Sequence, residues 1–403
     1  MDILPILAAL KRQKTAAALI AIEIALCCAI VCNALYLIVH RIERSSIESG
    51  LAESELIQVI TAGMGTEDAS QRQREDLRTL AALPGVKHAA VINQMPFWRS
   101  AWNTSIRMNA EDQNSVMDAG AYYADENLID TFGLRLIAGR NFTPDEIVEF
   151  QALYSGEQYP SVVIITASLA RSLFGDEDPL GKQFYPANEP TRVIGVVERL
   201  IRPNISEDPA FTGASMILPI RLSEGVGFFV LRTDPADRAA VIQAATEKLR
   251  ETSPNRIVLG AKTMEELRDK HFRQDRVMAG LLAAVVVSLL VVTALGIVGL
   301  ASFWVQRRRR QIGIRRALGA TRGDILRYFQ TENFLIVTVG IVLGVLAAFA
   351  ISGWLMRQYE LPRLPLYYLP ASAITLWLLG QLAVLAPALR AASVPPATAT
   401  RTV

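Results

Sequence analysis

Residues 306–325 read QRRRRQIGIRRALGATRGDI and lie between two long apolar runs. Four consecutive arginines, Arg307 to Arg310, closely follow an uncharged stretch from Val277 to Val305. About 29 residues at ~1.5 Å each are enough to cross a hydrocarbon core of ~30 Å. Because arginine-rich loops stay on the cytosolic side of a membrane, the sequence predicts a cytosolic loop between two membrane spans.

This loop has the pattern of a short folded helix. Ile314, Ala317 and Leu318 stand at spacing i, i+3, i+4, which places them on one helix face. Gly319 suits a left-handed residue that closes this helix, and Thr321 with Asp324 suits a cap that opens the next one. We therefore expect an apolar face that inserts into a groove on a partner. The alternative is that the arginines only fix the topology of the spans.

At these residues the chain resembles the MacB/FtsX family of ABC-transporter permeases, whose cytosolic loop carries the pattern R-E-I-G-I-R-R-A-x-G-A. The resemblance implies that a separate cytosolic ABC ATPase docks here and binds the ATP and Mg²⁺, so that this chain needs no cofactor. Gln311 stands where the family has glutamate, which removes an acid that could pair with a basic group on the ATPase. The implied docking residues are Arg310, Gln311, Ile312, Gly313, Ile314, Arg315, Arg316, Ala317, Leu318, Gly319 and Ala320.

Four apolar runs are long enough to span a membrane, and they are Thr15 to Val39, Val277 to Val305, Asn333 to Met356 and Pro370 to Leu389. Lys11, Arg12 and Lys14 precede the first run, which predicts that both termini are cytosolic. The predicted fold class is a membrane protein of four transmembrane helices with a large α+β extracytoplasmic domain between helices 1 and 2. The resemblance implies the bacterial inner membrane, with the large domain in the periplasm.

The external region has a strand, helix, strand pattern at each end, from Leu56 to Ile92 and from Phe228 to Leu259. These ends are expected to pair into one α+β subdomain, residues 41–97 and 225–262, which the resemblance describes as porter-like. A β-rich subdomain, residues 98–224, is inserted between them. The other expected segments are 1–40 (amphipathic segment and first span), 263–305 (stalk helix and second span), 306–332 (coupling loop), 333–356 (third span), 357–369 (external loop), 370–389 (fourth span) and 390–403 (cytosolic tail).

The apolar composition of the spans suits helices that transmit motion rather than helices that line a path for solutes. Thr263 and Glu266 match a capping box, which predicts a helix that runs through Phe272 into the second span as a single rod. A path for polar solutes would need polar groups inside the spans, and these spans carry almost none. Gly340 and Gly344 stand at GxxxG spacing in the third span and favour close helix contacts, within one subunit rather than between two.

Composition limits the possible functions. Apolar residues make up 51% of the chain and charged residues 20%, which fits a membrane protein with a large soluble part. Residues 41–276 carry about eight more acids than bases, which argues against nucleic acid as a partner. Cys27, Cys28 and Cys32 all lie in the first span, so the external region contains no disulfide.

Sequence motifs of catalysis are missing, since the chain has no HExxH, CxxC or GxSxG pattern. The stretch GDEDPLGK from Gly175 to Lys182 superficially matches a phosphate-binding loop. It has five residues instead of four between its glycines, and Gln183 replaces the metal-binding Ser or Thr. We predict a turn between a helix and a strand there, and a subunit that is not an enzyme.

The resemblance implies a permease subunit in a mechanotransmission system, in which a cytosolic ATPase moves the external domains of a permease homodimer or paralogous heterodimer. The expected role is efflux from the periplasm through a periplasmic adaptor and an outer-membrane duct, with membrane lipids around the spans. Alternatives within the family are lipoprotein release and FtsX-like activation of a cell-wall hydrolase. From another class, a membrane-bound receptor or sensor stays open, although it would need a cytosolic output domain.

Overall fold

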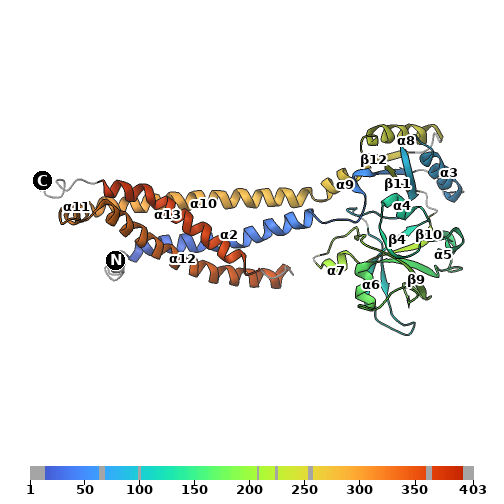
Figure 1. The fold of residues 1–403 in the computed structure, drawn as a ribbon, viewed down its shortest axis with the longest axis horizontal. Helices are drawn as coiled ribbons and strands as arrows, with labels where there is room; N and C mark the ends of the chain where they lie inside the picture. The colour runs from blue at the N-terminus through green and yellow to red at the C-terminus, as the bar shows by residue number, and fades with distance from the viewer. Residues whose placement is uncertain are drawn as a thin grey trace. The chain divides into compact units, whose positions relative to one another are not determined.

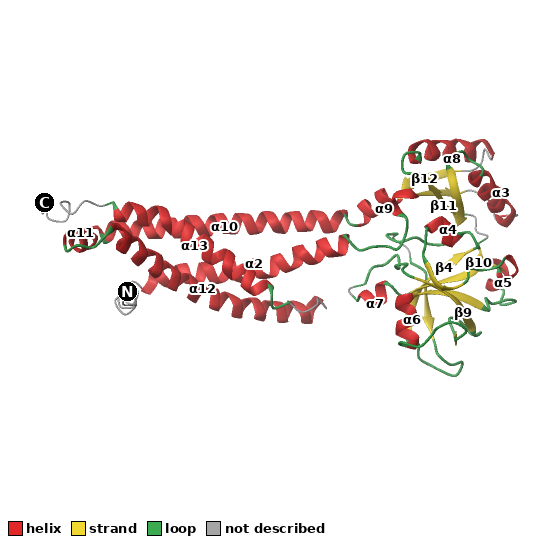
Figure 2. Cartoon of the chain, in the orientation of Figure 1, coloured by secondary structure: helices red, strands yellow, loops and turns green. Residues whose placement is uncertain are grey.

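The computed structural model describes residues 14–62, 69–98, 101–206, 208–222, 226–252, 257–359 and 365–393. The chain forms two compact units. Residues 1–46 with 274–403 are called the membrane unit here, and residues 47–273 the α/β unit. Figures 1 and 2 show the elements of each unit. The amphipathic segment expected before Lys14 and the tail beyond Ser393 lie outside the described residues.

The membrane unit contains four long helices, and they are α2 (Lys14–Ser45), α10 (Arg273–Arg307), α12 (Arg322–Tyr359) and α13 (Tyr368–Ala392). Among the described residues, these four helices are long and apolar enough to cross a membrane. A helix satisfies its own backbone N–H and C=O groups, which a bilayer core requires. The four predicted spans are confirmed, and each helix extends beyond its predicted span at both ends.

Helices α2 and α12 pack closely at two glycines. A Cβ atom added to Gly340 would lie 2.8 Å from the Ala21 carbonyl oxygen, and one added to Gly344 would lie 2.5 Å from Cys28 Cβ. No side chain fits at such a separation, so the two backbones approach each other through the glycines. The predicted packing of this GxxxG pair within one subunit is confirmed.

Helix α10 is packed far less than its neighbours. In its most apolar window 17% is buried, whereas the figure for α2 is 50%. Many of its apolar side chains are exposed along its length. They include Val277, Leu281, Val285, Val287, Val291, Val292 and Leu295. A helix with this surface must face lipid or another helix.

The α/β unit contains a four-stranded antiparallel sheet in the order β12 (Ile257–Thr263), β1 (Leu56–Ala62), β11 (Gly227–Thr233) and β2 (Val86–Val91). Helices α3 (Ala69–Ala81) and α8 (Arg238–Thr252) cover one face of this sheet. Leu80 of α3 and Val241 of α8 share a buried cluster with Phe229 of β11. The two ends of the long segment between α2 and α10 therefore meet in one sheet.

A second, mixed sheet has the strand order β3-β4-β10-β7-β9-β5, with β6 beside β10 and β8 beside β9. Its strands are β3 (Asn103–Ile106), β4 (Met117–Ala124), β5 (Leu136–Gly139), β6 (Val148–Glu149), β7 (Val162–Thr166), β8 (Gln183–Phe184), β9 (Thr191–Val197) and β10 (Ser215–Arg221). Short helices join them, and they are α4 (Leu128–Phe132), η2 (Pro144–Glu146), α5 (Phe150–Tyr154), α6 (Ala167–Phe174) and α7 (Pro209–Thr212), while η1 (Glu53–Glu55) precedes β1. Gly175 ends α6 with φ +64° and a turn leads to β8, as predicted for this stretch.

The two sheets share one hydrophobic core. Ala90 and Val230 of the four-stranded sheet lie in the same buried cluster as Tyr122 and Ile217 of the second sheet. The Tyr122 hydroxyl donates a hydrogen bond of 2.6 Å to the carbonyl oxygen of Ile201, which satisfies its polar atom inside this core. The sheets are therefore packed together as one body.

The helix that begins at Thr263 is shorter than predicted. The capping box is confirmed, because Glu266 N–H donates to Thr263 Oγ1 at 3.2 Å and Thr263 N–H donates to Glu266 Oε2 at 3.1 Å. However, α9 (Met264–His271) ends before Phe272, whose φ of −91° and ψ of 6° lie outside helical geometry, and α10 begins at Arg273. The predicted single rod is wrong. Phe272 is fully buried against Phe97 in the core of the α/β unit, and this tertiary packing interrupts the helix.

Candidate docking site on helix α11

Helix α11 (Arg309–Ala317) forms most of the segment between α10 and α12. Leu318 is its C-cap, and Gly319 follows with a φ of +98°. Gly319 N–H donates to the Arg316 carbonyl at 3.2 Å, and Ala320 N–H donates to the Arg315 carbonyl at 3.0 Å. This pair of bonds is a Schellman motif. The prediction that Gly319 closes the helix in the left-handed conformation is confirmed.

Thr321 and Asp324 form the start of α12. Asp324 N–H donates to Thr321 Oγ1 at 3.2 Å, and Thr321 N–H donates to Asp324 Oδ2 at 2.9 Å. These reciprocal bonds satisfy two N–H groups that a helix start leaves without partners. The predicted cap is confirmed, so the connection from α11 to α12 has a defined geometry.

Helix α11 has one buried and one exposed side. Ile312 is buried in a cluster with Phe329 of α12 and Ala388 of α13. Ile314 is 47% exposed and Leu318 is 83% exposed, and Ala317 between them is also exposed. These three residues are called the apolar face of α11 below. Neighbouring apolar side chains that are this exposed, on a short helix whose C-terminal end is closed by a Schellman motif, suit a surface that binds a partner.

Positive charge surrounds the apolar face. Arg315 places its guanidinium 4.8 Å from the centre of the Tyr328 ring, and Arg316 turns back to donate a 2.8 Å bond to the Ala392 carbonyl. The sequence from 306 to 323 contains no acidic residue. The exposed polar residues of α11 are Arg309, Arg310, Gln311 and Arg315. A partner surface that complements this one would carry negative charge.

The structure separates the eleven predicted docking residues into three groups. Ile312 and Gly313 are buried, and they hold α11 against α12 and α13. Arg316 and Ala320 are half-buried, and the other seven residues are exposed. The exposed group includes the apolar face. That an ATPase docks on it stays a prediction.

One feature of the site was not predicted from the sequence. Arg308 Nη1 donates to both carboxylate oxygens of Glu332, at 3.0 and 2.8 Å. The Arg308 side chain is 11% exposed and the Glu332 side chain 2% exposed. Both residues belong to the predicted coupling loop, residues 306–332, and no sequence pattern indicated that they pair. Glu332 lies inside α12, and the two charges neutralise each other in a buried pair.

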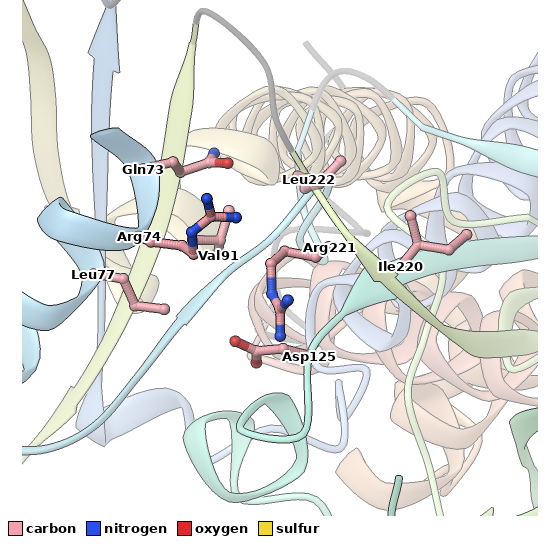
Figure 3. A pocket seen from close by; sticks show the side chains of 8 residues that line it. All are labelled: Gln73, Arg74, Leu77, Val91, Asp125, Ile220, Arg221 and Leu222. Carbon is pink, nitrogen blue, oxygen red and sulfur yellow. The ribbon is translucent and has the colours of Figure 1, made fainter. Parts of the chain in front are cut away.

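A second candidate site is a small pocket in the α/β unit, between α3 and the end of β10 (Figure 3). Arg221 of this pocket forms an ion pair of 2.9 Å with Glu149, and burial raises the pKa of Asp125. The pocket has a volume of about 30 Å³, which suits one ordered water, whereas drug-sized ligands need ~300 Å³ or more. The residues that line it are Gln73, Arg74, Leu77, Val91, Asp125, Ile220, Arg221 and Leu222.

The membrane unit contains a larger cleft between α2 and α10, with a volume of about 290 Å³. Apolar side chains, including Ile38 and Ile42 of α2, form most of its surface, and the ion pair between Arg41 and Asp275 also lines it. Such a lining suits an acyl chain or the side chains of another helix better than a polar solute. In the part of the chain that the structure describes, no group of three or more His, Cys, Asp or Glu residues could hold a metal ion.

Comparison with known families covers both units. The model of the MacB-like periplasmic core domain matches residues 16–249, and the model of the FtsX-like permease C-terminal domain matches residues 283–396. The predicted resemblance over nearly the whole chain is confirmed. The first of these matches alone covers more than half of the chain and includes α2 with most of the α/β unit.

Individual proteins of similar sequence carry names that fit the same families. The chain is 30% identical to the macrolide export ATP-binding/permease protein MacB of Chromobacterium violaceum, over 55% of this chain and 33% of that protein. It is 24% identical to the uncharacterized ABC transporter permease YknZ of Bacillus subtilis, over 69% of this chain and 68% of that protein. The chain thus spans about a third of the length of this MacB relative.

Matches among solved structures include the periplasmic region of MacB from Actinobacillus actinomycetemcomitans, at 19% identity and a TM-score of 0.35, over 55% of this chain and 94% of that one. The extracellular domain of YknZ has 19% identity and a TM-score of 0.32, over 50% of this chain and 100% of that one. The family models, together with the four apolar helices, show a multi-pass membrane protein. The chain belongs to the MacB/FtsX family of ABC-transporter permeases.

Proposed function

We propose that this permease couples a separate cytosolic ATPase to movements of its α/β unit on the other side of the membrane. ATP and Mg²⁺ would be bound by the ATPase, and the permease itself would not be an enzyme. The single observation that carries the proposal is the apolar face of α11, where Leu318 is 83% exposed. Leaving such a side chain in water is unfavourable, whereas a partner groove that covers it gains apolar burial.

The charges of α11 define the groove that it would fit. The apolar face is flanked by Arg309, Arg310 and Arg315, and Gln311 contributes no negative charge. A matching ATPase groove would have an apolar floor and an acidic rim. Complementary charge at the rim would mainly speed association and exclude ATPases whose grooves carry basic residues.

The unburied helix α10 supports assembly with a second permease chain. Only 17% of its apolar window is buried within one chain. A second copy of this chain, or a paralogous permease, would cover part of this surface. Two permease chains would then present two α11 helices to two ATPase subunits, which nucleotide binding could draw together.

The transport direction is proposed from the relatives. The MacB relative carries macrolide export in its name, and this chain covers only a third of that protein. We propose export from the periplasm across the outer membrane, with the permease in the inner membrane, both termini cytosolic, and a periplasmic adaptor and outer-membrane duct as further partners. The α/β unit would then act on its partners from the periplasmic side.

One observation favours a second function, lipoprotein release. The cleft of about 290 Å³ between α2 and α10 has apolar walls that would accept an acyl chain. Lipoproteins carry acyl chains that such a cleft would hold, whereas the export of a macrolide does not require a site for an acyl chain. Co-purification of a palmitate-labelled lipoprotein with the permease would favour this function over drug export.

The docking proposal is tested by changing Ala317 and Leu318 to aspartate together. The apolar face would then carry two charges into a water-poor groove. Burying them without partners would weaken binding by roughly several kcal/mol. The double variant should lose at least about 90% of the ATPase that co-purifies with the wild-type chain, since 1.4 kcal/mol already changes an equilibrium tenfold. Protease protection of the α/β unit should be unchanged.

A matched control is the single variant Arg322→Asp. It changes the loop charge by the same amount, but Arg322 is an exposed residue at the start of α12 and lies outside the predicted docking residues. This control should keep its ATPase. Wild-type amounts of ATPase on the double aspartate variant would remove the docking assignment and leave the arginines as a topological signal.

A further inference from the structure

The buried pair of Arg308 and Glu332 stands at the junction between three helices. Arg308 is the single residue between the end of α10 at Arg307 and the start of α11 at Arg309. Glu332 lies in α12, 24 residues further along the chain, and is almost inaccessible to solvent. The pair therefore ties the N-cap of α11 to α12, at the residue directly before the predicted third span.

Stability alone does not explain an ion pair at this place. Burying two charges removes their hydration, and the attraction between them often does no more than offset this loss. Apolar side chains of similar volume would hold the helices together at least as well. What an arginine–carboxylate pair adds is a specific contact, because Arg308 Nη1 lies within hydrogen-bond distance of both carboxylate oxygens and hydrogen bonds between charged groups are stronger than neutral ones.

Neighbouring contacts extend this arrangement to α13 and to the body of α11. Asn333, next to Glu332, donates a 2.9 Å bond to the Gly380 carbonyl of α13. Tyr328, one turn before Glu332, lies under the Arg315 guanidinium of α11. Polar contacts thus run from the α10–α11 junction through α12 to α13.

We propose that the Arg308–Glu332 pair is the joint through which a displacement of α11 is passed to α12. This inference rests on the proposed function of α11 as the docking helix. Arg308 and Glu332 are positioning residues in this view, since both are buried and neither forms part of the exposed apolar face. A partner that pushes on Leu318 would move α11 and α12 as one body, because the joint resists rotation between them.

The first test needs only the full-length permease in lipid nanodiscs. The variant Glu332→Gln leaves Arg308 as a buried charge without its carboxylate, so the first turn of α11 should detach. Amide hydrogen exchange of residues 309–317 should become about tenfold faster or more, whereas exchange in α2 should stay the same. Arg322→Gln, which removes an exposed charge from the same loop, should change neither. If amide exchange of α11 is the same in Glu332→Gln as in the wild type, the proposal that this pair joins α11 to α12 is wrong.

The second test separates docking from transmission, with the ATPase that co-purifies with the wild-type chain. In R308M/E332M an apolar pair replaces the ion pair, so the helices should stay packed and the ATPase should still bind. The change in ATP hydrolysis that the permease causes should fall about tenfold, the equivalent of 1.4 kcal/mol of lost coupling. The reversed pair R308E/E332R should restore part of it.

Each outcome has a distinct meaning. Full coupling by R308M/E332M at normal ATPase binding would show that the pair only fills space, and would overturn the inference while leaving the docking proposal intact. Loss of binding in A317D/L318D together with loss of coupling in R308M/E332M supports both. If A317D/L318D still binds the ATPase, the docking proposal fails, whatever the exchange experiment shows about the joint.

Discussion

The packing inside the α/β unit differs from the packing inside the membrane unit. The largest fully buried side chains of the α/β unit include Tyr122, Phe132 and Phe272, which fill a core between two sheets. The contact of α2 with α12 is instead made by glycines that bring backbones together. Water drives the first kind of packing, but lipid is as apolar as the helices, so membrane helices depend on close contact. The stability of the membrane unit should therefore fall most when a glycine at a helix contact is replaced by a larger residue. The stability of the α/β unit should fall most when a large core side chain is replaced by a smaller one.

The largest effect is expected for added volume in the membrane unit. A Cβ at Gly344 would lie 2.5 Å from Cys28 Cβ and 2.7 Å from the Ala25 carbonyl oxygen, so Gly344→Leu should separate α12 from α2 and prevent a stable fold. Gly353→Leu in the same helix is the control, because a Cβ there has nothing within 4 Å. The measurement is the monodisperse yield in detergent. A wild-type yield for Gly344→Leu would contradict the close contact of α2 with α12.

A smaller but still large effect is expected for removed volume in the α/β unit. Phe132 is fully buried and packs edge-to-face on Tyr122, with ring centres 6.3 Å apart. Phe132→Ala should destabilise this unit by about 3–5 kcal/mol, because it leaves a cavity in the shared core. Exchange of the β4 amides in the full chain should become about a hundredfold faster or more. Tyr154→Ala, at an 82% exposed residue, should change it little.

Predictions from the sequence succeeded where the signal is local. Each of the four spans depends on one continuous run of apolar residues. The capping box of Thr263 with Glu266 and the cap of Thr321 with Asp324 each depend on residues within a few positions of one another. The left-handed closure at Gly319 is of the same kind, since glycine adopts this conformation without a steric penalty. Such features were confirmed because each depends on residues within one continuous stretch of the chain.

Predictions failed where a distant residue decides the structure. Phe272 continues a helical pattern, and only its contact with Phe97, 175 residues earlier, shows why the helix stops there. Arg308 cannot be told from Arg307, Arg309 and Arg310 by sequence, because the partner that distinguishes it lies on α12. The family pattern names both Ile312 and Ile314 as docking residues, although the fold buries the first and exposes the second. The helical spacing placed only Ile314 on the apolar face, in agreement with its exposure.

The smallest effect is expected from surface charge in the α/β unit. Arg140 donates to Glu146 at 2.5 and 2.8 Å, and Thr143 N–H donates to the same carboxylate at 3.0 Å. The hydrogen bonds from Arg140, the largest cause, lower the pKa of Glu146 from 4.5 to about 2. Because the folded pKa lies below the unfolded value, this stabilisation is fully present above pH 4.5 and is lost as the pH falls toward 2.

The pair is partly exposed, so its contribution should be below about 1 kcal/mol. Glu146→Gln should therefore speed amide exchange around Thr143 only slightly at pH 6, and the difference from wild type should vanish as the pH approaches 2. Because no added or removed volume is involved, the core and the α2–α12 contact should be unaffected. A loss of the whole fold in Glu146→Gln would mean that charge, and not the shared core between the sheets, holds the α/β unit together.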